Sequence, residues 1–199
     1  MSEQNAADAP PSEPSRAGAA GATRWANYLE WLREEVIVGV LSLSAGERRT
    51  TRLLSGWTPV ELLSHVLHME RRWFLWGFLG EPVADLWGDW SMPEPWAGDD
   101  SGETAPAARW QVAAGVTADD LAAQLRAVGE RTRAILATRD LGELASPGGR
   151  FAEDPPTLEW ICFHVLAEYA RHTGHLDIVG EMARADAALV NRGGGGEEA

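Results

Sequence analysis

Apolar residues recur at helical spacing in four stretches of this sequence, and segments rich in glycine, proline and aspartate separate the stretches. In the first stretch, residues 24–41, the apolar side chains that lie one turn apart are Tyr28, Leu32, Val36 and Val40. This spacing places them along one face of an amphipathic helix. The stretch is therefore predicted to be a helix that buries this face.

The second stretch opens on a clear signal for the start of a helix. Thr58 is suited to the N-cap, Pro59 to the first helical position, and Glu61 completes a Thr-x-x-Glu capping box. The apolar pattern continues to about Leu79, where Gly80 favours a stop. A second helix is predicted between these limits.

The last two stretches also have the features of helices. The fourth is predicted to span about residues 158–185, with Thr157 as its cap. The third starts near Thr117, with Asp120 in the first turn, where an acidic side chain suits the helix dipole. Its predicted buried face consists of Leu121, Leu125, Val128 and Ile135.

Four helices with almost no strand signal predict an all-α fold, an antiparallel four-helix bundle. The long loop between the second and third helices, residues 81–116, is rich in Trp, Pro, Gly and Asp. A loop of this length inside a compact domain usually has a function, such as covering a site. Residues 1–23 and 187–199 are poor in large apolar residues, so we expect disordered tails on either side of one domain, residues 24–186.

Composition narrows the classes of partner and compartment. The net charge of -13 argues against nucleic acid and anionic membrane surfaces as partners, because both favour basic patches. The sequence has no apolar run of membrane-spanning length and no visible secretory signal, so a cytoplasmic location is expected. The single cysteine, Cys162, lies between Ile161 and Phe163 and is predicted to be a buried structural thiol rather than a nucleophile.

All five histidines fall in two short windows of the predicted second and fourth helices: His65, His68, His164, His172 and His175. On a helical wheel, Glu168 and His172 share an arc with Ile161 and Val179, which should face the core. Buried carboxylates and imidazoles are costly unless they are paired or bound to a metal. The fourth helix therefore has polar groups in its core that need a partner.

A divalent metal would satisfy these groups. Glu168 and His172 are four residues apart, so their side chains lie one helical turn apart and can reach one ion. His65, in the middle of the second helix, can supply a third ligand from across the bundle. Two imidazoles and one carboxylate leave open coordination positions, which is typical of a catalytic rather than a structural site.

The other histidines and the tryptophans leave alternatives open. His68 is expected at the surface or against a loop, since it lies on a different face from His65. Either His164 or His175 could orient a ligand or complete the coordination of the metal as a fourth ligand. The tryptophans between residues 87 and 110 either anchor the core or line a pocket.

Two segments resemble the signatures of a known superfamily. Residues 168–177, Glu-Tyr-Ala-Arg-His-Thr-Gly-His-Leu-Asp, resemble the fourth-helix signature of DinB-like (YfiT-like) proteins of actinobacterial type. In this resemblance His172 takes the position of a metal ligand. Residues 65–74 resemble the second-helix signature, in which His65 is a ligand. The resemblance covers most of the chain and implies a four-helix bundle with one mononuclear metal, commonly zinc or nickel.

The third ligand separates this chain from many members of that superfamily. Glu168 stands where many DinB-like proteins have histidine. The resulting His, Glu, His set is similar to the metal site of mycothiol-dependent maleylpyruvate isomerase, in its N-terminal domain. The superfamily also includes other enzymes that use small thiols.

These features support two expectations of function. The first is an enzyme in which the metal, zinc or nickel with iron as a further candidate, activates a small thiol such as mycothiol towards an electrophile, by transfer, isomerisation or hydrolysis. The second is a non-catalytic metal-binding or stress-response protein with a structural or vestigial site. Catalytic residues other than the metal ligands are not identified, and a homodimer is one expectation for assembly.

Overall fold

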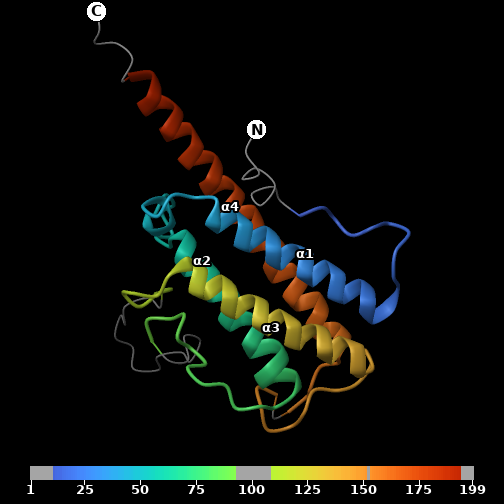
Figure 1. Ribbon diagram of the computed structural model, residues 1–199. Helices are drawn as coiled ribbons and strands as arrows, with labels where there is room; N and C mark the ends of the chain where they lie inside the picture. The colour runs from blue at the N-terminus through green and yellow to red at the C-terminus, as the bar shows by residue number, and fades with distance from the viewer. Residues whose placement is uncertain (1–10, 93–108, 152, 194–199) are drawn as a thin grey trace, which may run out of the picture.

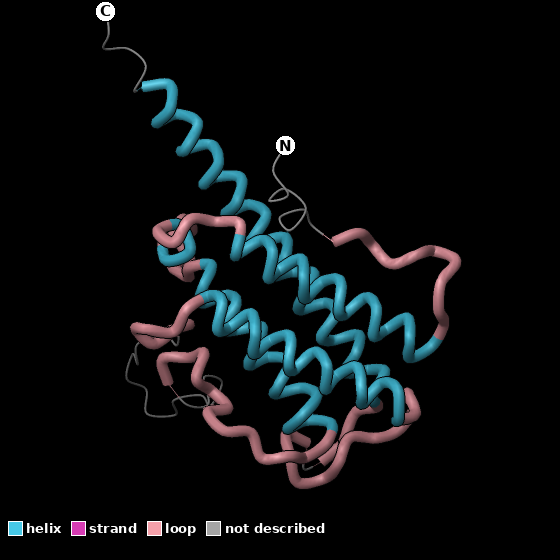
Figure 2. Tube along the Cα trace, viewed as in Figure 1, coloured by secondary structure: helices cyan, strands magenta, loops and turns pink. Residues whose placement is uncertain are grey.

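The computed structural model describes residues 11–92, 109–151 and 153–193. Within these residues the chain is helical and forms no strand, only two isolated bridges between loop residues, as Figure 2 shows. The elements are α1 (Gly21–Leu41), the short η2 (Glu47–Arg49), α2 (Pro59–Glu70), η3 (Arg71–Phe78), α3 (Ala118–Thr138) and α4 (Leu158–Gly193). The all-α fold with four helices is as predicted.

The four α-helices pack into one bundle. The helix α1 lies against both α3 and α4, and α2 contacts the same two helices, as can be followed in Figure 1. Leu32, Val36 and Val40 of α1 are buried, and so are all four residues of the predicted face of α3. In the described part of the chain, no helix is long and apolar enough to cross a membrane.

Local hydrogen bonds fix where three of the helices begin. Thr58 accepts from the backbone N–H of Glu61, whose carboxylate accepts from the backbone N–H of Thr58 (2.8 Å). Thr117 and Asp120 form the same reciprocal pair at the start of α3. Thr157 accepts a hydrogen bond within the first turn of α4. These caps satisfy N–H groups that a helix start leaves without an intrahelical partner.

Two helices are longer than predicted. The helix α1 starts at Gly21, and the preceding segment is held against it because Trp31 donates to the carbonyl of Pro11 (3.1 Å). The helix α4 continues to Gly193 and includes residues 187–193, which were expected in the C-terminal tail. This correction has a simple reason, since residues 181–192 contain four alanines and no glycine or proline, and alanine has the highest helix propensity.

The second helix changes its pitch halfway. It was predicted as one α-helix to about Leu79, but α2 ends at Glu70 and η3 continues as a π-helix. At its end the backbone N–H of Leu79 donates to the carbonyl of Phe74 (3.1 Å), five residues earlier. Such wider turns often occur at functional sites. Here the π-helical residues Arg72 and Trp73 are buried beside a cavity described below.

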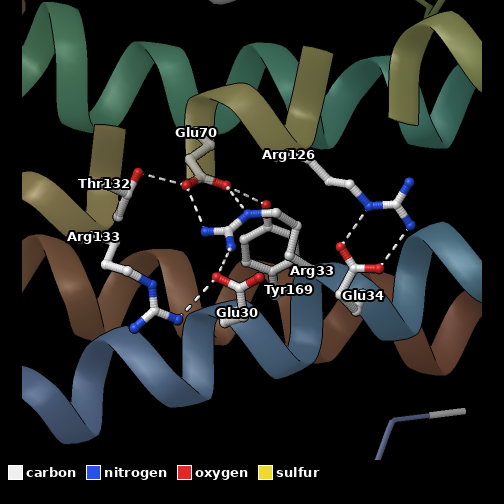
Figure 3. Close-up of polar contacts among 8 residues, drawn as sticks. All are labelled: Glu30, Arg33, Glu34, Glu70, Arg126, Thr132, Arg133 and Tyr169. Carbon is white, nitrogen blue, oxygen red and sulfur yellow. Dashed lines mark hydrogen bonds and ion pairs between the residues drawn. The ribbon is translucent and has the colours of Figure 1, made fainter. Parts of the chain in front are cut away.

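A buried ion pair joins all four α-helices (Figure 3). Arg33 of α1 donates to both carboxylate oxygens of Glu70 at the end of α2, at 2.8 and 3.1 Å. Thr132 of α3 and Tyr169 of α4 each donate a hydroxyl hydrogen bond of 2.5 Å to the same carboxylate. Burial and the neighbouring Glu70 raise the pKa of Tyr169, so its phenol keeps the proton that it donates. Four hydrogen bonds thus compensate a carboxylate that has no exposure to solvent.

The ion pair also explains a glycine in the middle of α3. A Cβ atom at Gly129 would lie only 2.4 Å from the guanidinium carbon of Arg33. Glycine costs about 1 kcal/mol relative to alanine in a helix interior. The position is therefore glycine because the buried arginine occupies the space of a side chain.

We expect Glu70→Gln to lower the free energy of unfolding by about 3–5 kcal/mol, because it leaves the Arg33 charge buried without its main counterion. Glu34→Gln is the matched control, since it breaks the partly exposed pair with Arg126 that Figure 3 also shows. The control should cost less than about 1 kcal/mol. Urea denaturation followed by circular dichroism measures both, and equal losses would contradict a special role for the buried pair.

Candidate metal centre

The structure brings together the three side chains that were predicted to bind a metal. His65 lies in the middle of α2, and Glu168 and His172 lie one turn apart on α4. One potential ligand atom from each residue lies within 4.8 Å of the other two. The imidazoles are buried and their ring centroids are 5.0 Å apart, while Glu168 is partly exposed.

The hydrogen bonding of His172 tests whether a metal fits here. Both of its ring nitrogens are buried, and neither has a hydrogen-bond partner among the described residues. Its Nε2 is 3.3 Å from Oε2 of Glu168, close enough for an ion pair but not aligned as a hydrogen bond. A buried polar group left unsatisfied costs about 1–3 kcal/mol. A divalent ion bound by one of these nitrogens would remove that nitrogen's share of the cost, so the donor set fits a metal.

The other imidazole is already oriented as a metal ligand would be. Nδ1 of His65 lies 2.8 Å from Oδ2 of Asp89, a carboxylate with no exposure to solvent. Since a carboxylate only accepts hydrogen bonds, Nδ1 carries the proton and the lone pair is on Nε2. This carboxylate–histidine arrangement is the usual second contact of a metal-binding histidine. Burial lowers the pKa of His65, so the ring is neutral, as a metal ligand must be.

The carboxylate of Asp89 is itself held by Arg72 of η3. The two Arg72 terminal nitrogens donate to the two carboxylate oxygens at 2.6 and 2.8 Å. Burial by itself raises the pKa of Asp89, but the hydrogen bonds from Arg72 and His65 outweigh it and hold the pKa below its usual value. Asp89 is therefore ionised at neutral pH and fixes the His65 ring.

The long loop between η3 and α3 contributes to the centre through its two described ends. Trp90 and Trp110 form an isolated bridge, and the backbone N–H of Gln111 donates to the carbonyl of Asp89 (2.9 Å). Trp110 stacks on His65 with ring centroids 4.1 Å apart. Residues 93–108, which include Trp96, lie outside the described residues. Within the described part, the loop supplies both a carboxylate and aromatic rings to the site.

A cavity of about 400 Å³ opens beside the three predicted ligands. Trp73, Trp90 and Trp110 form part of its wall, so tryptophans of the loop do line a pocket. A larger hollow of about 690 Å³ shares Trp90 and Trp110 but is lined by none of the three ligands. The smaller cavity is the candidate site, because the three predicted ligands line it.

The remaining histidines of α4 lie around the cluster rather than in it. His164 packs against the rings of Trp73 and Trp160, and its Nε2 is 3.8 Å from Glu168. The ring centroid of His175 is 5.9 Å from that of His172. Neither joins the three side chains whose ligand atoms converge.

The surface position expected for His68 is wrong. His68 is buried, and its Nδ1 lies 2.9 Å from the carbonyl oxygen of Ser64. Every residue of α2 except Glu61 is buried, so this helix has no solvent-facing side on which His68 could lie. Burial also lowers the pKa of His68, which keeps the ring neutral.

The cysteine is buried as predicted. Cys162 has no exposure to solvent, and burial raises the pKa of its thiol to about 12. A thiol with this pKa carries almost no thiolate at neutral pH. It is therefore not a nucleophile for the cavity.

Asp89 could not be singled out from the sequence, where it is one of several acidic residues in the loop. The only available signal is general. A metal-binding histidine usually donates its second ring N–H to a carboxylate or carbonyl, so the loop should contain such a partner.

We expect Asp89→Asn to weaken zinc binding by about 10–100-fold, because His65 loses the charge that orients its ring. Asp85→Asn, the same change in the same loop, is the control. Asp85 has a φ of 51°, a conformation that asparagine also tolerates. Competition with a chelating dye gives the affinities, and equal values for the two variants would show that Asp89 does not support the site.

Comparison with known proteins assigns most of this chain to one family. The family model described as mycothiol-S-transferase matches residues 25–185, which include all three predicted ligands and Asp89. This family is part of the DinB-like superfamily, in agreement with the resemblance of the two helix signatures. Searches among curated proteins and among solved structures found no match. Since the matched segment covers well over half of the sequence, the chain belongs to the mycothiol-S-transferase family.

Proposed function

We propose that this protein is a metal-dependent transferase that joins mycothiol, through its sulfur, to a small electrophile. His65, Glu168 and His172 would bind one divalent ion, zinc or nickel with iron as a further candidate. The observation that carries the proposal is the buried imidazole of His172, whose two nitrogens lack a hydrogen-bond partner in the described part of the chain, while a second imidazole and a carboxylate lie beside it. The family of the chain supports mycothiol as the thiol.

The bound metal would supply a Lewis acid that lowers the pKa of a thiol at an open coordination position. The chain's own groups prepare that position. Asp89 holds His65 with its Nε2 lone pair available, and Glu168 contributes a negative charge. The contact with His172 lowers the pKa of Glu168, so the carboxylate is ionised at neutral pH and able to bind a cation.

In the proposed reaction the sulfur forms a bond to an electrophilic carbon. The bond from that carbon to its leaving group breaks, the leaving group takes the electron pair, and the thiol proton passes to solvent. The aromatic walls from Trp73, Trp90 and Trp110 would shield the reacting atoms from water.

Two further predictions from the sequence belong to this proposal. The four helices run antiparallel, and the loop of residues 81–116 helps to shape the pocket for the electrophile.

The metal itself is tested by elemental analysis of the purified protein. We expect close to one divalent ion per chain in the wild type and almost none in His172→Gln, which removes a ligand. His175→Gln is the matched control on the same helix, and it should retain the metal because its ring lies outside the cluster. Loss of the metal from both variants would instead indicate a fully coordinated, structural site.

Turnover is tested with iodoacetamide as the electrophile and with mycothiol, cysteine or coenzyme A as the thiol. Metal-loaded wild type should accelerate alkylation of mycothiol well above that of the other thiols. The acceleration should disappear in His172→Gln and persist in His175→Gln. A metal-loaded protein that does not accelerate the reaction of any of these thiols would favour the non-catalytic alternative.

A further inference from the structure

Three arginines line the cavity beside the candidate metal centre, and two of them already bind carboxylates. Arg72 is paired with Asp89, and Arg171 lies 3.3 Å from Glu168. The third is Arg150, in the segment between α3 and α4. Among the residues that the structure describes, no carboxylate forms an ion pair or hydrogen bond with Arg150.

The surroundings of Arg150 are aromatic instead. Its guanidinium carbon lies 4.4 Å from the ring centroid of Trp73 and 5.9 Å from that of Trp76. These contacts hold the guanidinium against aromatic rings, and among the described residues none of its hydrogen-bond donors has a protein acceptor. Burial lowers the pKa of Arg150, and the nearby charge of Arg72 lowers it further, although a guanidinium stays protonated at neutral pH. Within the described part of the chain, the cavity thus holds a positive charge that no carboxylate pairs with.

Trp73 connects this charge to the metal centre. Its ring packs on Arg150 on one side and lies 4.0 Å, centroid to centroid, from the ring of His164. Nε2 of His164 is in turn 3.8 Å from the carboxylate of Glu168. The wall of the cavity from the arginine to the predicted ligands is therefore a row of flat rings. Such a wall suits a planar, apolar molecule with an anionic group at one end.

From these contacts we propose that Arg150 is a specificity-determining residue that binds the carboxylate of the electrophilic substrate. The electrophile would be a planar unsaturated or aromatic carboxylate, with its ring or double bond against Trp73 and its reactive carbon towards the metal centre. A guanidinium matches a carboxylate with two parallel hydrogen bonds, which a single lysine or a neutral donor cannot provide. That the bound carboxylate is an electrophilic substrate rests on the proposed function. The anion site itself rests only on Arg150 and its surroundings.

Direct binding tests the anion site without requiring any reaction. Full-length protein, with and without zinc, is titrated by calorimetry with benzoate, with benzamide as the neutral analogue and with phenylphosphonate as another oxyanion. We expect benzoate to bind at least about tenfold more tightly than benzamide in both forms, the size expected for hydrogen bonds to a charged group. Tighter binding of phenylphosphonate than of benzoate would overturn the choice of carboxylate.

The variant Arg150→Met keeps the apolar stem and removes the charge. It should bind benzoate at least about tenfold more weakly than wild type, with and without zinc. The control Arg131→Met removes an exposed arginine that pairs with Glu81 away from the cavity, and it should bind benzoate as wild type does. Benzoate binding that needs zinc and is unchanged in Arg150→Met would show that the metal, not the arginine, receives the carboxylate, and would refute the proposal.

A kinetic measurement separates this proposal from the proposed function. The ratio of kcat/KM for iodoacetate to that for iodoacetamide, each corrected for the uncatalysed rate, should fall about tenfold in Arg150→Met. If neither the wild type nor any variant accelerates alkylation of mycothiol, but benzoate binding depends on Arg150, the transferase proposal fails and the anion site stands. If turnover is normal and the ratio is unchanged in Arg150→Met, the anion site fails and the transferase proposal stands.

Discussion

The buried ion pair between Arg33 and Glu70, with its hydrogen bonds from Thr132 and Tyr169, joins side chains of all four α-helices. Both side chains are almost completely removed from water, so their charges are tolerable only while the surrounding donors are in place. Those donors include Tyr169, which is next in sequence to Glu168, while Glu70 lies five residues after His65. The pair therefore fixes the register of α2 against α4 within about one turn of the proposed metal ligands. A slip of either helix would leave a charge unpaired in the core.

A second set of contacts transmits this order to the imidazole of His65. The π-helix η3 continues directly from Glu70 and carries Arg72, which binds Asp89 of the following loop. Asp89 then orients His65. His65 lies on α2, the same helix that ends at Glu70. Hydrogen bonds from Arg72 and His65 hold the pKa of Asp89 below its usual value, so this carboxylate is ionised. Protein side chains therefore fix the orientation of the His65 ring independently of any metal ion.

What the sequence could predict is what depends on nearby residues. The capping box of Thr58 and the turn-apart pair of Glu168 and His172 are local, and the structure contains both. The contact between Asp89 and His65 is not local, because a loop brings the carboxylate back across 24 residues. The helical wheel placed His68 at the surface because it assumes that one side of a helix faces solvent, whereas α2 is buried on almost every side.

The burial of Cys162 bears on whether electrophilic substrates could modify the protein itself. If the proposed transfer reaction takes place, the protein meets an electrophile at every turnover, and an accessible thiolate on its surface would be readily modified. This chain has a single sulfhydryl, fully buried in the core and held protonated by a pKa of about 12. The protein thus offers no accessible thiolate that would compete with the thiol of the proposed reaction. Electrophiles that enter the cavity should therefore leave Cys162 unmodified.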